Sequence, residues 1–463
     1  MSKVELRANL EKLGVHPSKM LGQNFLLDSN LARAIVADSN PQKGDHCVEI
    51  GPGMGALTEH LYNSAASRIT LIERDHRFVA ALKQRYESSR VRVIGGDAAK
   101  IDLRELYGYG PIKVIGNLPY SASTAIIARF TEALSPASSL VLMLQREVAQ
   151  RLAATPGDDD YGALTVLLGR RWCVKKKRIV PPDVFWPRPS VESAVVKITR
   201  RPIQEIPPCN EAFFHDMVRL GFSSRRKQLG SLLKTSSSRW LQIVTDLGYP
   251  PTIRAENLNI KEWSFLVNQL SLVSPESKEE LFDVVDENDI VVSSQERHFV
   301  HVNKLLHRAV HIWIFNNRGE LFLQKRSYWK ENHPGLWCSS VAGHVSAGEN
   351  YLEAAKRELF EELGVNVPLQ LIHRILASEV TGQEFVECFV GIAEEPFFLD
   401  PEEIETGAFF HPRLIQEWID IHPEEFTPLF KVIAKKFLNE PECLFKSESL
   451  GHNIPFKDLK KSN

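Results

Sequence analysis

The sequence predicts an α/β fold, with a doubly wound parallel sheet in the first half of the chain and a second α/β module behind it. In the first 200 residues, short apolar runs alternate with segments of helical periodicity, which is the pattern of repeated βαβ units. The two halves also differ in charge: residues 1–270 carry 37 Lys and Arg against 26 Asp and Glu, and the remainder carries 19 against 32. This asymmetry indicates two modules with different partners.

Length and composition exclude several other classes of protein. A chain of 463 residues predicts two to four folded units, and 43% hydrophobic with 25% charged residues is typical of a globular protein. No stretch approaches the roughly 18 apolar residues of a membrane span, and the charged start of the chain lacks the apolar core of a signal peptide. The six cysteines form no CxxC pair. We therefore expect a cytoplasmic protein with no membrane partner and no disulfide framework.

The apolar runs and breaks predict the order of the domains. Five runs in the first domain, residues 1–200, predict buried strands at 46–50, 68–73, 91–96, 113–117 and 140–145. The segments that follow predict a small helical domain at 201–272, a linker at 273–280, a second α/β domain at 281–440 and a lysine-rich tail at 441–463. In the second α/β domain, two β-like runs flank Asn317–Gly319, which predicts a hairpin.

A glycine-rich turn follows the first predicted strand and indicates a bound cofactor. Gly51, Gly53 and Gly55 would let the backbone approach a ligand closely. Glu73 ends the next strand, where a carboxylate can bind two ribose hydroxyls. These features predict a cofactor that contains adenosine, but a dehydrogenase would use the same plan. A tight turn without any ligand is the remaining alternative.

Two motifs at the ends of the third and fourth strands help to distinguish between these candidate cofactors. Asp97 is placed to accept a hydrogen bond from an adenine amino group. The tetrapeptide Asn117–Tyr120 suits methylation of an exocyclic amine, because the Asn117 side chain and the Leu118 or Pro119 carbonyl can accept both amine hydrogens. Tyr120 can stack on the base. A loop whose proline merely ends a strand would explain the tetrapeptide alone, but not all these features in this order.

Such a target base must be unpaired or flipped out of a duplex, and aromatic groups usually clasp it. Phe185, on a proline-rich segment, is our candidate for this role, although it could equally be a core aromatic. Two basic runs predict contacts with RNA phosphates, although solvated surface charges would look the same. The basic residues are Lys175, Lys176, Lys177 and Arg178 in the first run and Arg225, Arg226 and Lys227 in the second.

Residues 5–270 resemble the KsgA/RsmA family of ribosomal RNA adenine dimethyltransferases. The resemblance rests on Lys19 and on the motifs LGQNFL (21–26), EIGPGMGALT (49–58), NLPY (117–120), VPPDVFWPRPSVESAVV (180–196) and a helix with FSSRRKQL (222–229). The related Erm enzymes, which act on large-subunit RNA, share the core, but the last two motifs favour the small-subunit group. The resemblance implies a Rossmann-like class I methyltransferase domain followed by a small helical RNA-binding subdomain.

The same resemblance implies the cofactor, the substrate and the binding residues. The methyl donor would be S-adenosylmethionine, and the target would be the N6 amines of two adjacent adenosines in the 3′-terminal hairpin of small-subunit (16S) ribosomal RNA in the 30S subunit. Matching motifs imply cofactor contacts from Asn24, Leu26, Gly51, Glu73, Asp97 and Asn117. We expect Asn117, Pro119, Tyr120 and Phe185 to form the catalytic pocket.

The second α/β domain contains a Nudix box without a mismatch, GX5EX7REUXEEXGU from Gly343 to Val365, where U is a bulky aliphatic residue. Asn350 and Gly364 are typical of the two ends of a helix over about 351–363. Glu358, Glu361 and Glu362 stand on one face of that helix, where Mg²⁺ or Mn²⁺ would relieve their repulsion and bridge to a diphosphate. We also expect Arg357 to pair with Glu349. A solvated acidic face would explain the charges but not the flanking glycines.

Sequence around the box resembles the Nudix branch close to isopentenyl-diphosphate isomerase, which implies an α/β/α sandwich. His301, His307 and His344 are additional candidate metal ligands, because matching histidines bind metal in that isomerase. However, Ala342 stands where the isomerase carries its catalytic cysteine. We therefore expect hydrolysis of a small-molecule diphosphate rather than isomerisation.

Taken together, the sequence predicts a ribosomal RNA dimethyltransferase fused to a Nudix hydrolase. Two alternatives stay open: a ribosome-assembly checkpoint protein with little catalysis, and prenyl-diphosphate isomerisation by the second half. The substrate of the Nudix domain does not follow from the sequence.

Overall fold

The computed structural model describes residues 3–15, 24–108, 111–271, 280–330 and 332–438. The chain forms two compact units, one up to Leu270 and one from Ser271 onward, with the short segment Pro208–Ala212 grouped with the second. All but the last residue of the predicted linker at 273–280 lies outside the described residues, as do the predicted tail at 441–463, Lys19 and the start of the LGQNFL motif. The domain boundaries expected from the sequence remain predictions.

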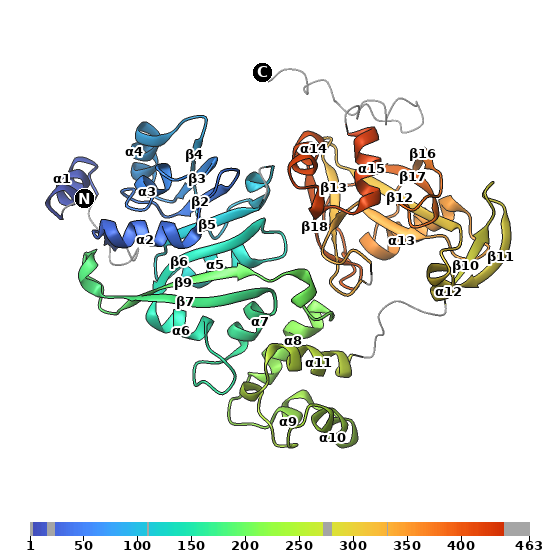
Figure 1. Cartoon of the computed structure of the whole chain (residues 1–463), viewed down its shortest axis with the longest axis horizontal. Coiled ribbons are helices and arrows are strands. Elements are labelled where there is room, and N and C mark those ends of the chain that lie inside the picture. Colours follow the sequence, from blue (N-terminus) through green and yellow to red (C-terminus); the bar gives the residue numbers. More distant parts are fainter. Residues whose placement is uncertain (1–2, 16–23, 109–110, 272–279, 331, 439–463) are drawn as a thin grey trace. The chain divides into compact units, whose positions relative to one another are not determined.

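The first unit is built on one seven-stranded sheet (Figure 1). Five parallel strands are followed by β9, which runs antiparallel to both β6 and β7. In sheet order the strands are β4 (Val91–Gly95), β3 (Arg68–Glu73), β2 (His46–Ile50), β5 (Ile112–Asn117), β6 (Ala137–Gln145), β9 (Ser193–Arg200) and β7 (Trp172–Val180). The predicted α/β fold and its parallel strands are confirmed. The strands β9 and β7 at one edge, of which only β9 runs opposite to the other six, were not expected.

Helices cover both faces of this sheet, because the central strands are apolar on both sides. In β2, Cys47 belongs to one apolar cluster, whereas Val48 and Ile50 belong to another. The first cluster includes residues of α1 (Lys3–Lys12), α2 (Ser29–Ser39), α3 (Thr58–Tyr62) and α4 (His76–Tyr86). The second includes residues of α5 (Ser123–Thr131), α6 (Arg146–Leu152) and α7 (Ala163–Arg171). The carboxyl ends of β2, β3 and β5 therefore meet at one edge between two helical layers.

The expected helical region follows the sheet. It contains α8 (Glu211–Gly221), α9 (Leu229–Leu233), α10 (Ser237–Asp246) and α11 (Ile260–Leu270). The segment FSSRRKQL is not a continuous helix, as we had expected, because α8 ends at Gly221 and a turn precedes α9. In that turn the Lys227 amide donates a hydrogen bond to the Ser224 carbonyl at 3.1 Å. The three basic residues at 225–227 therefore lie in a turn.

The second unit contains a mixed seven-stranded sheet and a separate two-stranded one (Figure 1). The large sheet comprises β14 (Trp337–Cys338), β13 (Leu321–Arg326), β12 (His307–Phe315), β17 (Glu384–Ile392) and β16 (Gln370–Ile375), with β15 (Val341–His344) on β12 and β18 (Ile404–Phe410) on β13. The small sheet pairs β10 (Leu281–Val285) with β11 (Val291–Glu296). The predicted hairpin is confirmed, because β12 and β13 are antiparallel and Gly319 adopts a φ of +73° between them.

Helices lie on both faces of the large sheet. On one face, Val310 and Ile312 of β12 pack with Leu359 of α13 (Tyr351–Leu363). On the other, the Trp313 ring lies 5.8 Å from that of Phe430 in α15 (Pro428–Phe437). The remaining helices are α12 (Arg297–Val302) and α14 (Pro412–Ile421). The unit is an α/β/α sandwich, as expected.

None of the described helices is long and apolar enough to cross a lipid bilayer.

Candidate active sites

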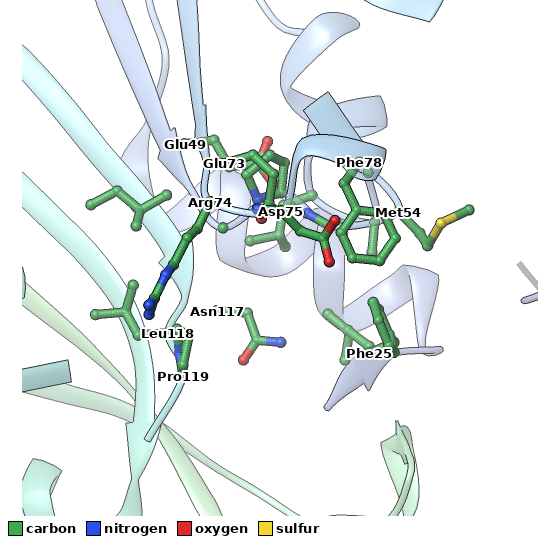
Figure 2. Close-up of a pocket in the computed structure, with 18 of the residues that line it drawn as sticks. Phe25, Glu49, Met54, Glu73, Arg74, Asp75, Phe78, Asn117, Leu118 and Pro119 are labelled. Carbon is green, nitrogen blue, oxygen red and sulfur yellow. Dashed lines mark hydrogen bonds between the residues drawn. The ribbon is translucent and has the colours of Figure 1, made fainter. Parts of the chain in front are cut away.

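A cavity of about 460 Å³ opens at the carboxyl edge of the first sheet, where ligands of open α/β folds bind. In Figure 2, Glu73 and Asn117 are labelled on opposite sides of this space. The structure brings together all six predicted cofactor residues and three of the four predicted catalytic residues, Asn117 being in both sets. Lining the cavity are Asn24, Leu26, Gly51, Glu73, Asp97, Asn117, Pro119 and Tyr120.

The glycine turn and the strand-end acid form one hydrogen-bonded unit. Gly51 and Gly53 adopt φ values of +64° and +53°, which side-chain-bearing residues rarely adopt. The Gly53 amide donates to Glu73 Oε2 at 2.9 Å, and the Asp75 amide donates to Oε1 at 2.8 Å. Burial raises the pKa of Glu73, although these two bonds oppose the shift. The backbone therefore fixes the carboxylate at the cavity wall.

Glu49 is a second buried acid at this wall that the sequence analysis missed. It lines the cavity, and its Oε2 has no hydrogen-bond partner among the described residues. Burial raises the pKa of Glu49 to about 8. The only signal in the sequence was an acidic residue inside the apolar run HCVEI. Hydrogen bonds from the Thr58 side chain and backbone reach the carboxyl group, so only this one oxygen remains available to a ligand.

The NLPY motif begins at the last residue of β5 and lines the cavity. The Asn117 side-chain amide donates to the Asn24 carbonyl at 3.0 Å, which leaves its Oδ1 oriented as an acceptor. Gly116 permits this geometry, since a Cβ atom there would lie 2.9 Å from the Ile50 carbonyl oxygen. The Tyr120 hydroxyl forms a 2.7 Å hydrogen bond with Ser193.

Phe185 is not part of this cavity, contrary to our expectation. It is only 3% exposed and belongs to a core cluster. It lies in the short strand β8 (Phe185–Trp186), opposite Leu26 of β1 (Phe25–Leu26). This pairing buries the ring behind the N-terminal segment, so the structure agrees with the alternative interpretation of a core aromatic.

The first basic run is divided between solvent and an internal acid. Lys175 and Lys176 are exposed on β7, which lies at the edge of the sheet. By contrast, Arg178 and Lys177 lie 2.5 Å and 3.7 Å from the Asp38 carboxylate. A register shift in the pairing with β9 occurs at this point of β7. Only part of the run is therefore available to an external anion.

The second basic run shows the same division. Arg225 lies 3.4 Å from the Glu256 carboxylate and also donates to the Asp159 carbonyl. Arg226 and Lys227 are exposed, and no ion pair involves them within the described part of the chain.

In the second unit, the Nudix-box helix has the predicted bounds. The Glu353 amide donates to Asn350 Oδ1 at 3.0 Å, and Gly364 ends the helix with a φ of +69°. Arg357 forms the expected pair with Glu349, through two hydrogen bonds of 3.0 and 2.9 Å. Arg357 therefore joins the helix α13 to the loop that carries Glu349.

The three box glutamates occupy different environments. Glu358 is largely buried, and burial raises its pKa to about 7. Glu362 is buried and accepts a 3.0 Å hydrogen bond from Gln324; burial, with the charges of Glu403 and Glu358, raises its pKa well above the usual value. Glu361 is 55% exposed and bonds to Arg357 at 3.1 Å. The three carboxylates are not among the described groups whose ligand atoms converge within 4.8 Å.

Glu403 and Lys330 complete this acidic centre and were missed by the sequence analysis. Lys330 Nζ lies 2.7 Å from the Glu403 carboxylate, and Glu403 is the largest charged contribution to the raised pKa of Glu362. The only signal for Glu403 was the acidic segment PEEIE. The centre therefore includes Lys330, 21 positions before the helix, and Glu403, 40 positions after it.

The three predicted histidines do meet. His301, His307 and His344 place one ring nitrogen each within 4.8 Å of the others. Glu384, which the sequence analysis missed, lies 3.2 Å from His344 Nε2, and the Phe282 ring stacks on His344 at 4.6 Å. Burial lowers the pKa of His301 to about 4. Clustered imidazoles are suited to binding a metal ion.

The histidine and acidic centres lie on opposite faces of the large sheet. In β15, Gly343 is paired with Val310 and His344 with Ala309 of β12. Val310 belongs to the core beneath α13, and successive residues of a strand face opposite sides. The two candidate metal centres are therefore separate sites.

Comparisons with known proteins agree with the division of the chain into two different units. Residues 16–271 match the family model described as ribosomal RNA adenine dimethylase, and residues 305–430 match the NUDIX domain model. The protein named ribosomal RNA small subunit methyltransferase A from Lactiplantibacillus plantarum is 38% identical over 57% of this chain and 93% of its own length. The protein of the same name from Xanthobacter autotrophicus is 38% identical over 57% and 92%.

A solved structure of the 23S rRNA methyltransferase ErmE is 22% identical, with a TM-score of 0.46 over 53% of this chain and 99% of its own. The NUDIX match does not support the isomerase-like branch that we had inferred. The dimethylase model, however, spans more than half of the 463 residues. The chain therefore belongs to the ribosomal RNA adenine dimethylase family, and a NUDIX domain follows the part that it shares with that family.

Proposed function

We propose that the first unit transfers methyl groups from S-adenosylmethionine to the N6 amines of two adjacent adenosines in the 3′-terminal hairpin of small-subunit ribosomal RNA. The observation that carries this proposal is the position of Asn117, whose side chain is fixed by the Asn24 carbonyl at the cavity. The names of the relatives support small-subunit ribosomal RNA as the substrate.

The residues of the cavity fit this cofactor. Glu73 would bind the ribose hydroxyls and Asp97 the adenine amino group, while the turn at Gly51 and the segment from Asn24 to Leu26 would enclose the rest. The unpartnered buried oxygen of Glu49 favours a cation over the diphosphate of a dinucleotide. When bound, S-adenosylmethionine supplies an electrophilic methyl carbon on a sulfonium.

The chain's own residues prepare the amine. Asn117 Oδ1 and the Leu118 or Pro119 carbonyl would accept its two hydrogens, which draws the nitrogen lone pair out of conjugation with the ring. Tyr120 would stack on the base and hold it. No strong base is needed, because the proton leaves after the nitrogen has formed its new bond. Positioning and fixed dipoles would supply most of the rate enhancement.

The test is methyl incorporation from labelled S-adenosylmethionine into small ribosomal subunits that lack the modification. We expect labelling by the wild type and a loss of at least about 100-fold in Asn117→Ala. Asn63→Ala, at the exposed end of α3, is the matched control and should label normally. Equal labelling by Asn117→Ala would exclude the pocket that we propose. Tight binding to subunits without labelling would instead favour a checkpoint role.

We further propose that exposed basic side chains of the first unit contact ribosomal RNA phosphates. The candidates are Lys175, Lys176, Lys177, Arg226 and Lys227. Lys177, Arg178 and Arg225 contribute less, because acidic residues of the chain already pair with them.

For the second unit we propose hydrolysis of a small-molecule diphosphate with Mg²⁺ or Mn²⁺. Glu358 and Glu362 would bind the metal, Glu403 would complete the set, and Glu361 would join after release from Arg357. The raised pKa values of Glu358 and Glu362 support this role, since a divalent cation would relieve the repulsion between buried carboxylates. The ion would polarise the diphosphate and activate water.

A screen of nucleoside and prenyl diphosphates with Mg²⁺ tests this activity. Glu362→Gln should lose metal-dependent turnover, whereas Glu417→Gln, an exposed change on α14, should retain it. Undiminished turnover in Glu362→Gln would exclude the metal role of that residue.

We propose that the histidine centre is a second metal site, with His301, His307, His344 and Glu384 as ligands. Equilibrium dialysis with Mn²⁺ should show one equivalent fewer in His344→Ala than in the wild type. Glu362→Gln should keep that equivalent, because the acidic centre lies on the other face of the sheet. An unchanged stoichiometry in His344→Ala would exclude the site.

A further inference from the structure

Ser193 is a buried hydroxyl whose partner is the phenol of Tyr120. The two oxygens lie 2.7 Å apart, and Ser193 is fully shielded from solvent. Ser193 is not among the described residues that line the cavity, so it touches the site only through Tyr120. It is the last residue of the segment PSVES (189–193).

The sheet topology explains how Ser193 reaches this position. Because β9 runs antiparallel to β6, its first residue lies at the edge where the parallel strands end. Ser193 is paired with Gln145 of β6 on one side and with Val180 of β7 on the other. Two strands therefore hold its backbone, and a hydroxyl placed on such a scaffold is well fixed.

Tyr120 is held at both of its ends. Ser123 Oγ, at the start of α5, donates to the Tyr120 carbonyl at 3.1 Å, and Ser193 holds the phenol oxygen. Rotation about the Cα–Cβ bond would carry the ring away from a stacked base. A displacement of about 1 Å at a reacting centre can lower a rate roughly 100-fold, so the orientation of this ring matters for transfer.

We propose that Ser193 is a positioning residue, which keeps the Tyr120 ring in the plane required to stack on the target adenine. This inference rests on the function proposed for the first unit. Ser193 acts through one hydrogen bond and makes no contact with substrate or cofactor.

A double-mutant cycle with Ser193→Ala and Tyr120→Phe tests this role, using labelled S-adenosylmethionine and small subunits that lack the modification. Each single change should lower kcat roughly three- to tenfold, the effect expected from one hydrogen bond. The KM for S-adenosylmethionine should stay constant, and the double variant should be no slower than Tyr120→Phe alone. Ser139→Ala is the control, since this buried serine lies at the opposite end of the β6–β9 pair.

Several outcomes would overturn the inference. These are a wild-type kcat in Ser193→Ala, losses that multiply in the double variant, or a raised KM for the cofactor with kcat unchanged. If Ser193→Ala does not fold, Tyr120→Phe removes the same hydrogen bond by deleting only the phenol oxygen, and a wild-type kcat there would be equally decisive. Absence of transfer by the wild type would instead contradict the proposed function itself.

Discussion

A Cβ atom at position 343 would lie 2.1 Å from the carboxyl carbon of Glu358. Any side chain at the first glycine of the Nudix box would therefore have to displace the carboxylate of Glu358, a largely buried glutamate of the same box. This contact binds the end of β15 to the middle of α13.

Gly343→Ala should displace the Glu358 carboxylate and remove metal-dependent diphosphate hydrolysis. We also expect a loss of about 1–3 kcal/mol in the free energy of unfolding of the second unit, as for other overpacked sites. Denaturant unfolding and turnover with Mg²⁺ are the measurements. Gly162→Ala, where a Cβ atom meets nothing within 4 Å, should change neither; full hydrolysis by Gly343→Ala would contradict the role of this contact.

Glu49 should make the stability of the first unit fall as the pH rises. Its pKa is about 8 in the folded state and near 4.5 when unfolded, so the folded state binds more protons between these values. The free energy of unfolding should therefore decrease from about pH 4.5 to 8, by on the order of a few kcal/mol at most. Glu49→Gln should flatten this part of the profile in chemical denaturation at a series of pH values; an unchanged slope would show that Glu49 is ionised when folded.

Phe185 offers a test of core packing against base clasping. Phe185→Ala should lower the free energy of unfolding by about 3–5 kcal/mol, as expected for a buried ring. Phe185→Leu should cost less than about 1.5 kcal/mol and leave methyl transfer nearly unchanged. A stable Phe185→Leu variant with severely reduced transfer would restore the stacking role that the sequence first suggested.

The two parts of the first basic run should behave differently. Lys175→Ala and Lys176→Ala should weaken RNA binding and each lower the salt dependence of log K by roughly one, with no change in stability. Arg178→Ala should instead lower the free energy of unfolding by no more than about 1 kcal/mol, because its pair with Asp38 is only partly buried. Filter binding at several salt concentrations distinguishes these effects, and an equal salt response of all three variants would contradict the division.

The features that could be predicted from the sequence are those with strong local patterns. The strands at 46–50 and 68–73 and the helix at 351–363 have the predicted bounds, because apolar runs and a capping box act over a few residues. The strand β7 was hidden by Lys175–Arg178, whose charges interrupt the apolar pattern on an edge that faces solvent. The strand β9, which begins with Ser193 and pairs with both β6 and β7, was not predicted either.

The features that could not be predicted depend on contacts between distant segments. Nothing local shows that Phe185 pairs with Leu26, or that Glu384 approaches His344. The raised pKa values of Glu49 and Glu362 likewise arise from burial, which only the packed structure determines.

In β15, adjacent residues serve the two centres of the second unit from opposite sides of the sheet. Inserting or deleting one residue before Gly343 would exchange the two sides, so that a histidine would point towards the acidic helix and the glycine would face the other imidazoles. A register shift of one residue would thus disable both centres together, whereas most substitutions would affect only one. The length of this short strand is therefore constrained more tightly than its composition.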